Sequence, residues 1–302
     1  MFFFVSEPPS TDLTYCYGQF CPPDLPLNNH TNSWMESKMA ATGDDQKHFV
    51  LVHGACHGAW CWFKLKPLLE AAGHRVSAFD LSASGTNTKV IQDVATLADY
   101  SIPLLEFMAT IPPEKKVVLV GHSLGGMNLA LAMEKFPEKI SIAIFLTAFM
   151  PDTVHRPSYV FDQYNKSTPR EAWLDTQFLP YNNVNESETS MFFGPEFLSL
   201  KLYQHCSDED LELGKILIRP GSLFLKDLAA TEQFTKGKYG SVKRAYVICD
   251  EDKAIKEEFQ RWMIEINPVV EVKKLNCVDH MPMLCDPKQL SVCLLDIAHE
   301  YA

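Results

Sequence analysis

The chain has 302 residues, of which 46% are hydrophobic and 22% are charged, a composition typical of a globular protein. Its 27 basic and 38 acidic side chains give a net charge of −11, which repels phosphate backbones, so no nucleic-acid partner is expected. No apolar run approaches the roughly 20 residues that a membrane span needs, so no membrane partner is expected either.

The first 45 residues differ from the rest of the chain. Residues 1–45 contain two proline pairs and a polar run at 28–32, and no hydrophobic periodicity persists there, so we predict a disordered N-terminal extension. The stretch has no arginine, which does not fit a transit peptide. A start of translation at Met35 or Met39 and an uncommon targeting signal are both compatible with this segment.

From residue 46 on, short apolar runs alternate with stretches of helical periodicity. In chain order we predict a strand at 48–53, a helix at 57–72, a strand at 75–79, a helix at 90–110, a strand at 116–120, a helix at 124–135, a strand at 140–146, a strand at 244–249, a helix at 254–266, a strand at 269–275 and a helix at 287–301. Unbroken apolar strands separated by helices predict an α/β domain over 46–302, with a mostly parallel central sheet and helices on both faces.

The alternation breaks between about 150 and 235. This stretch holds six prolines and many aromatic side chains, with only short helical pieces. It is too long for a loop inside a compact sheet. We interpret it as a cap inserted over the carboxyl edge of the sheet, where open α/β sheets bind ligands.

The cysteines indicate the redox compartment. Nine cysteines are scattered along the sequence, and no CxxC pair occurs, so neither a zinc ribbon nor a thioredoxin-type redox site is supported. Cys249 and Cys293 lie inside apolar runs, as small core residues do. The pattern predicts free thiols in a reducing compartment, and hence a cytoplasmic protein.

The strongest chemical signal is a candidate nucleophile. The sequence GHSLG at 121–125 matches the G-x-S-x-G pattern of a nucleophile elbow, directly between a predicted strand and a predicted helix. A sharp strand-to-helix turn lifts the serine oxygen clear of the sheet, and glycine neighbours prevent a backbone clash. A glycine turn with a capping serine is the structural alternative. The flanking strand and helix favour Ser123 as a nucleophile.

A serine of ordinary pKa needs a base, and in this fold the acid and then the histidine follow it along the chain. Only His280 and His299 lie in the final strand-and-helix unit. His299 falls within the helical pattern at 287–301, which indicates a surface position. His280 lies in the loop after the last predicted strand, at the edge where Ser123 emerges, so we predict His280 as the base.

The acid that orients the imidazole is expected after the penultimate strand. Three acidic residues follow that strand at 250–252. Asp279 adjoins His280 and would have to fold back on its own neighbour to reach the ring. From the residues alone, Asp250 and Asp252 stay rivals for this role.

The oxyanion of an acyl-transfer reaction needs two backbone N–H donors. Leu124 follows the nucleophile and is predicted to supply one of them. The loop after the first strand is rich in small residues and supplies the other, for which Ala55 is the better candidate. We interpret His53, His57 and His122 as residues that shape the surrounding loops.

Several long blocks of the sequence closely resemble the plant methylesterase family of α/β-hydrolases. They are HFVLVHGACHGAWCWFKLKPLLEAAGH at 48–74, GHSLGGMNLALAMEKFP at 121–137, CDEDKAIKEEFQRWMIEI at 249–266 and VDHMPMLCDP at 278–287. The resemblance covers about residues 46–302, including the cap, and is nearest to the salicylic acid-binding methyl salicylate esterases. The same family includes hydroxynitrile lyases, and it implies an α/β-hydrolase fold and a homodimer.

The resemblance also implies roles for particular residues. The family's triad falls on Ser123, Asp252 and His280, which selects Asp252 from the two rivals. Its oxyanion donors match Ala55 and Leu124. Its aromatic-acid pocket matches six residues identical in type here: Tyr164, Trp173, Phe178, Met191, Leu223 and Met281. The structural alternative is that these six side chains are ordinary core of the cap.

Two positions separate an esterase from a lyase. One group of hydroxynitrile lyases resembles this chain but has Thr and Lys where this chain has Gly54 and Met281. A lysine would stabilise departing cyanide, which Met281 cannot do, and Gly54 in the substrate site leaves room for an acyl group and a water. Both differences predict ester hydrolysis, which needs no metal and no cofactor.

The predicted substrates are methyl esters of small plant hormone acids. Methyl salicylate is favoured, and methyl jasmonate or methyl indole-acetate are the other candidates, because a slightly wider pocket changes preference by only about 1–3 kcal/mol. A hydroxynitrile lyase is one alternative function. A hormone-binding protein that retains its product acid is another, although every triad position is filled.

Overall fold

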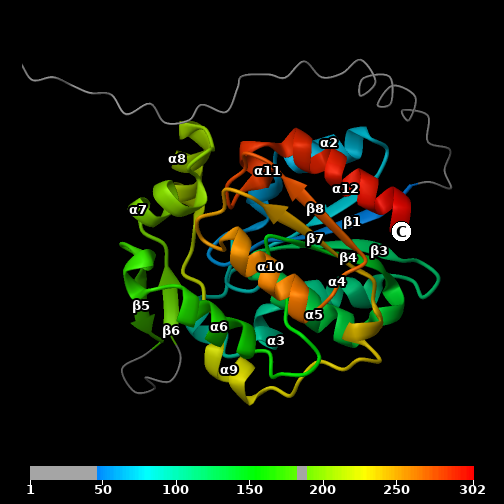
Figure 1. Cartoon of the computed structure of the whole chain (residues 1–302), viewed down its shortest axis with the longest axis horizontal. Coiled ribbons are helices and arrows are strands. Elements are labelled where there is room, and N and C mark those ends of the chain that lie inside the picture. The colour runs from blue at the N-terminus through cyan, green and yellow to red at the C-terminus, as the bar shows by residue number, and fades with distance from the viewer. Residues whose placement is uncertain (1–45, 182–188) are drawn as a thin grey trace, which may run out of the picture. The chain divides into compact units, whose positions relative to one another are not determined.

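The computed structural model describes residues 46–181 and 189–302, and the extension predicted at 1–45 lies outside this part of the chain. Six strands form one parallel sheet in the order β2-β1-β3-β4-β7-β8, and β5 pairs with β6 in a separate antiparallel ribbon (Figure 1). The strands are β1 His48–Val52, β2 Arg75–Ala78, β3 Val117–His122, β4 Ile140–Leu146, β5 Gln177–Pro180, β6 Thr189–Phe192, β7 Arg244–Cys249 and β8 Glu271–Leu275.

Helices cover both faces of the large sheet. They are α2 Leu65–Ala71, α3 Leu97–Tyr100, α4 Ile102–Thr110, α5 Gly125–Lys135, α6 Tyr159–Ser167, α7 Pro195–Phe197, α8 Asp208–Leu217, α9 Leu225–Ala230, α10 Glu257–Ile266, α11 Pro282–Cys285 and α12 Pro287–Tyr301. Helices α2 and α12 contact each other on one face, while α3, α4 and α5 group on the other (Figure 1). The predicted α/β architecture, a parallel sheet between two helical layers, is confirmed.

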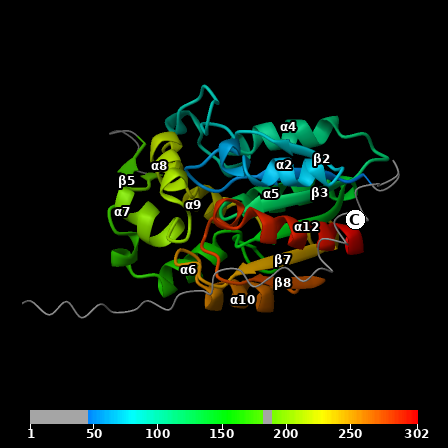
Figure 2. The same cartoon turned by 90° about the horizontal axis from the view of Figure 1, so that it is seen from above.

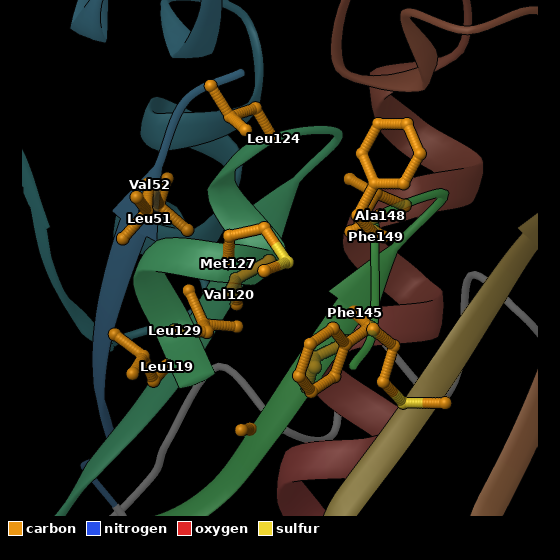
Figure 3. Packing of buried hydrophobic residues seen from close by; sticks show 14 of the residues in the cluster. Leu51, Val52, Leu119, Val120, Leu124, Met127, Leu129, Phe145, Ala148 and Phe149 are labelled. Atoms are coloured by element: carbon orange, nitrogen blue, oxygen red, sulfur yellow. The ribbon is translucent and has the colours of Figure 1, made fainter. Parts of the chain in front are cut away.

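The hydrophobicity of each strand matches its central or edge position in the sheet. The central strands β1, β3 and β4 are apolar runs buried along almost their whole length, because helices cover both of their faces. The edge strand β8 has the sequence EVKKL, and it alternates between more and less exposed side chains. Figure 3 shows Met127 and Leu129 of α5 beside Leu119 and Val120 of β3 and Phe145 of β4, in the middle of this core.

Two predicted helices are shorter than their sequence patterns indicated. The pattern at 90–110 divides into a 3-10 turn at Ile91–Asp93, α3 and α4, because Thr96 caps α3 and a proline occupies the first turn of α4. The pattern at 57–72 is a 3-10 turn at Ala59–Trp62 followed by α2. The short helix α11 was not predicted; it begins at Pro282.

The segment between β4 and β7 holds α6 to α9 with β5 and β6, which we call the cap. In both Figure 1 and Figure 2 these elements lie together at one end of the sheet. The division of the chain into a domain at 46–302 with an insertion at about 150–235 stays a prediction. No helix in the described ranges is long and apolar enough to cross a membrane.

Candidate active site

Ser123 occupies a sharp turn between β3 and α5. Its backbone φ is 54°, in the left-handed region that residues other than glycine seldom adopt. Neighbouring segments hold this turn, because the Ser123 carbonyl accepts hydrogen bonds from the N–H groups of Gly126 at 3.1 Å and Phe149 at 3.0 Å. A strained backbone fixed from two sides is the geometry expected of a nucleophile elbow.

The glycines of the motif are required for close packing. A Cβ atom on Gly126 would lie 2.2 Å from the carbonyl oxygen of Phe149, and one on Gly121 would lie 2.4 Å from a methyl group of Leu129. Both distances are too short for a carbon atom, so a side chain at either position would force its neighbours to move. The turn can therefore pack against β4 and α5 only with glycine on both sides of the serine.

His280 and Asp252 form a buried pair at the ends of neighbouring strands. His280 Nδ1 lies 2.6 Å from Asp252 Oδ2, and both side chains are almost fully buried. The loop after β7 thus brings Asp252 to the imidazole. Its rival Asp250 lies instead 3.8 Å from the ammonium group of Lys274.

Asp252 accepts hydrogen bonds at both carboxylate oxygens. Oδ1 accepts from the N–H groups of Ala254 at 2.7 Å and Ile255 at 2.8 Å, and Oδ2 accepts from the Thr147 hydroxyl at 2.5 Å as well as from His280. Four donors around one carboxylate hold it in one orientation. Since an ionised Asp252 can only accept, Nδ1 of His280 carries the proton, and Nε2 is left as the acceptor of the neutral ring.

His122 supports the loop that carries His280. Its Nε2–H donates to the carbonyl oxygen of His280 at 2.7 Å, and the two rings lie 4.6 Å apart between centroids. Burial, together with the neighbouring His280, lowers the pKa of His122 well below its ordinary value. His122 is therefore neutral, and it holds the loop that carries His280.

The predicted oxyanion donors lie next to the nucleophile. Ala55 and Leu124 both line the cavity that contains Ser123 and His280. In the described part of the chain, neither backbone N–H donates to a protein acceptor. Two free amide donors beside a serine oxygen can hold a developing negative charge.

His53 orients the first of these amides. The Leu81 N–H donates to His53 Nε2 at 3.1 Å, so Nδ1 carries the proton and donates to the Gly54 carbonyl oxygen at 2.8 Å. Because C=O and N–H point in opposite directions across a trans peptide, this bond turns the Ala55 N–H away from His53. Burial lowers the pKa of His53, which keeps it in this neutral form.

The cavity has an apolar wall and is narrow, because only about 30 Å³ of it can hold the centre of a water molecule. Its lining residues are Ala55, Ser123, Leu124, Phe149, Tyr164, Trp173, Met191, Phe193, Phe197, Leu202, Leu223, Ala254, Ile255 and His280. The Tyr164 hydroxyl donates to the Ala254 carbonyl at 2.8 Å and so is already satisfied. The polar groups that line the cavity include the Ser123 hydroxyl and the His280 imidazole, beside the backbone N–H groups of Ala55 and Leu124.

The structure brings four of the six predicted pocket residues to this wall: Tyr164, Trp173, Met191 and Leu223. Phe178 lies behind the wall, with its ring 5.3 Å from that of Trp173 and 44% of the residue exposed. Met281 is fully buried in the loop after His280. Gly54 lies under the nucleophile, since a Cβ atom there would come within 2.8 Å of Ser123 Cβ.

Several residues at the site were not identified from the sequence. Thr147, which bonds to Asp252, directly follows β4, and the rule that sites gather at the carboxyl ends of strands could have found it. Phe193 and Phe197 come from the cap and have no comparable signal. His299 is exposed on α12, as the helical pattern indicated.

The chain is similar to known proteins over most of its length. Residues 49–291 match the model of the alpha/beta hydrolase family. The chain is 60% identical over 255 residues to salicylic acid-binding protein 2 of Nicotiana tabacum, covering 84% of this chain and 98% of that protein. It is 58% identical over 257 residues to methylesterase 1 of Arabidopsis thaliana, covering 85% and 97% of the two chains.

A solved structure is similar over the same region. The crystal structure of polyneuridine aldehyde esterase superposes with a TM-score of 0.82 at 55% sequence identity, covering 84% of this chain and 99% of that one. The enzyme of that name from Rauvolfia serpentina is 54% identical over 259 residues. Relatives of this kind are matched over nearly their whole length.

Proposed function

The chain belongs to the plant methylesterase family of alpha/beta hydrolases and is a carboxylic ester hydrolase, and we propose that it hydrolyses methyl esters of small aromatic acids through Ser123, His280 and Asp252. One observation carries the proposal. His280 is held by Asp252 at 2.6 Å and shares an apolar cavity with Ser123, which sits at a strained turn. This is the arrangement that acyl transfer to a serine requires.

The reaction follows from the proton positions. His280 Nε2 takes the Ser123 proton as the serine oxygen attacks the ester carbonyl, and Asp252 stabilises the resulting imidazolium. The N–H groups of Ala55 and Leu124 bind the oxyanion of the tetrahedral intermediate. His280 then protonates the departing methanol. In the second half of the reaction, His280 activates a water molecule, which releases the free acid from Ser123.

The wall of the cavity supports a flat, apolar acyl group. Five aromatic side chains contribute to it, and the rings of Tyr164 and Trp173 lie edge to face with their centroids 6.1 Å apart. Aromatic surfaces of this kind favour a planar ring by stacking and edge-to-face contact. We therefore place methyl salicylate first among the substrates, ahead of methyl jasmonate and methyl indole-acetate.

The residues at positions 54 and 281 also favour ester hydrolysis over cyanohydrin cleavage. Met281 offers no cation to stabilise cyanide. Gly54 keeps the space beside Ser123 free for an acyl group, because any side chain there would collide with the serine Cβ. Buried cysteines such as Cys249 and Cys293, which form no disulfide, support a reducing compartment such as the cytoplasm.

The direct kinetic test replaces Ser123 by alanine. Turnover of methyl salicylate and of p-nitrophenyl acetate is expected to fall by about 10³-fold or more in Ser123→Ala, because the acyl-enzyme can no longer form. Ser241→Ala is the matched control, since Ser241 is exposed and bonds only to the Lys238 carbonyl. Turnover retained in Ser123→Ala would exclude the serine as nucleophile.

A second comparison tests the substrate class. Values of kcat/KM for the methyl esters of salicylate, jasmonate and indole-acetate should differ by roughly 10- to 200-fold, which is the range that pocket shape provides, with salicylate highest. Release of cyanide from mandelonitrile should not be detectable. Cyanide release faster than ester hydrolysis would identify a lyase instead.

A further inference from the structure

Two thiols and one carboxylate from separate parts of the chain meet beside the His280 loop. Cys206 lies in the turn between the π-helix at Leu198–Leu202 and α8, and belongs to the cap. Asp279 immediately precedes His280, and Cys285 is the last residue of α11. The two Sγ atoms and a carboxylate oxygen all lie within 4.8 Å of one another.

The carboxylate in this cluster is buried without a cationic partner. Asp279 is 0% exposed, and its two oxygens accept hydrogen bonds from the backbone N–H groups of Met281 and His205, each at 2.8 Å. Among the described residues, no lysine, arginine or histidine side chain forms an ion pair with it. Buried carboxylates are ordinarily paired with a cation or bound to a metal.

The geometry of the three donors fits one small cation. A tetrahedral zinc ion lies about 2.3 Å from sulfur and about 2.0 Å from oxygen, which places those two ligand atoms about 3.5 Å apart. Cys206 Sγ lies 3.5 Å from Asp279 Oδ2, to which its thiol donates a hydrogen bond while it is protonated. The backbone N–H groups on Asp279 already hold its oxygens in place, as outer hydrogen bonds do around metal ligands.

We propose that Cys206, Asp279 and Cys285 bind a thiophilic divalent cation of the zinc class, which links the cap to the loop that carries His280. Sulfur donors favour such cations over the hard ions Mg²⁺ and Ca²⁺. On binding, each thiol loses its proton, so two protons are released and no electron is transferred. Three protein ligands leave a fourth position for water.

This site takes no part in ester hydrolysis. The reacting atoms belong to Ser123, His280 and a substrate, and none of the three proposed ligands lines the cavity. The sequence could not indicate the site, because Cys206 and Cys285 are far apart in the chain and neither lies in a CxxC pair. Only the packing of the cap against the His280 loop brings the thiols together.

The test is a titration of the reduced full-length protein with zinc chloride and with cobalt chloride. We expect one equivalent of Zn²⁺ to bind, and one equivalent of Co²⁺ to give the charge-transfer absorption of thiolate–cobalt bonds. Magnesium chloride should not bind. Affinity should fall at least about tenfold in Cys206→Ser, in Cys285→Ser and in Asp279→Asn, because each removes one ligand.

Matched controls separate this site from a surface thiol. Cys277→Ser removes an exposed cysteine in the same region and should leave the affinity unchanged. The cysteine variants without metal should keep wild-type esterase activity, which shows that they fold. Zinc affinity unchanged in the Cys206→Ser, Cys285→Ser double variant, or no binding to the wild type, would overturn the proposal.

A measurement on the unmodified protein makes the outcome independent of the variants. Alkylation with iodoacetamide followed by peptide mapping should show that Zn²⁺ protects Cys206 and Cys285, but not Cys277. Equal labelling of Cys206 and Cys285 with and without Zn²⁺ would show that the two thiols are only hydrogen-bonded neighbours.

Discussion

At the scale of single residues, the site depends on groups that never touch the substrate. Asp252 is held by a hydroxyl and two backbone amides. His53 fixes the peptide that carries the Ala55 N–H, and His122 fixes the loop that carries His280. Preorganised groups of this kind contribute to catalysis because they need not rearrange as charge develops. Their removal should therefore change turnover more than it changes substrate binding.

Thr147 provides the cleanest test of this support. Thr147→Val keeps the shape of the side chain but removes the hydroxyl bound to Asp252, a hydrogen bond to a charged group worth about 1.5–3 kcal/mol. We expect kcat/KM for methyl salicylate to fall about tenfold or more. Thr147→Ser keeps the hydroxyl and should stay within about twofold of wild type. Equal activity of the Val and Ser variants would contradict this role.

Gly54 tests the steric requirement beside the nucleophile. An alanine Cβ there would lie 2.8 Å from Ser123 Cβ and 3.1 Å from His122 Nδ1, so the loop with the Ala55 amide must shift. Loss of an oxyanion donor costs about 10²- to 10³-fold, and Gly54→Ala should lower kcat by that order. Gly237→Ala is the control, because nothing lies within 4 Å of its Cβ position. A fully active Gly54→Ala enzyme would show that the loop tolerates the shift.

At the scale of elements, the strands of the sheet were predictable, whereas the short helices and strands within the cap were not. Strands such as β3 and β4 are apolar along their whole length, so their position and parallel pairing follow from the sequence. Ser123 follows from its motif and His280 from the order of the elements. The sequence of the cap shows no sustained hydrophobic periodicity, because its short helices take their positions from contacts with the sheet edge. Phe193 and Phe197 therefore enter the cavity without a local signal.

Arg219 links the cap to the loop after β2. Its guanidinium donates to the carbonyl oxygens of Gly85 at 2.9 Å, Asn87 at 2.5 Å and Lys89 at 2.7 Å. Arg219→Met keeps an apolar stem and removes all three bonds, so the free energy of unfolding should fall by about 1–3 kcal/mol. Urea denaturation measures this change.

The control for that experiment is Arg261→Met. Arg261 makes an exposed ion pair with Glu257 one turn away on α10, and such pairs contribute about 0.2–0.5 kcal/mol. The free energy of unfolding should therefore fall only slightly in Arg261→Met. A loss in Arg219→Met no larger than in Arg261→Met would show that the three carbonyl contacts do not hold the cap.

At the scale of the whole molecule, buried neutral histidines predict a pH-dependent stability. Burial lowers the pKa of His57 to about 4, and burial with the charge of Arg75 lowers that of His48 to about 4. The unfolded value is about 6.5, so between about pH 4 and pH 6.5 the unfolded chain binds protons that the folded chain does not. This stability is complete above about pH 6.5 and is lost as the pH falls towards 4.

His57 isolates one part of this effect. It donates from Nδ1 to the Ala55 carbonyl and accepts from the Tyr203 hydroxyl at Nε2, so it is held neutral in the fold. Each such group contributes up to about 1.4 kcal/mol per pH unit. Between about pH 5 and pH 6, His57→Gln should reduce the slope of unfolding free energy against pH by that amount. A slope in His57→Gln equal to that of the wild type would contradict the assignment.

The most direct measurement is the mass of the protein after reaction with a reactive phosphonate ester, which mimics the tetrahedral intermediate and bonds to an activated serine. We predict one adduct per chain on the peptide that carries Ser123, its loss in Ser123→Ala, and formation at least about 10³-fold slower in His280→Ala. An adduct on another residue, or labelling of Ser123 that does not depend on His280, would contradict the account.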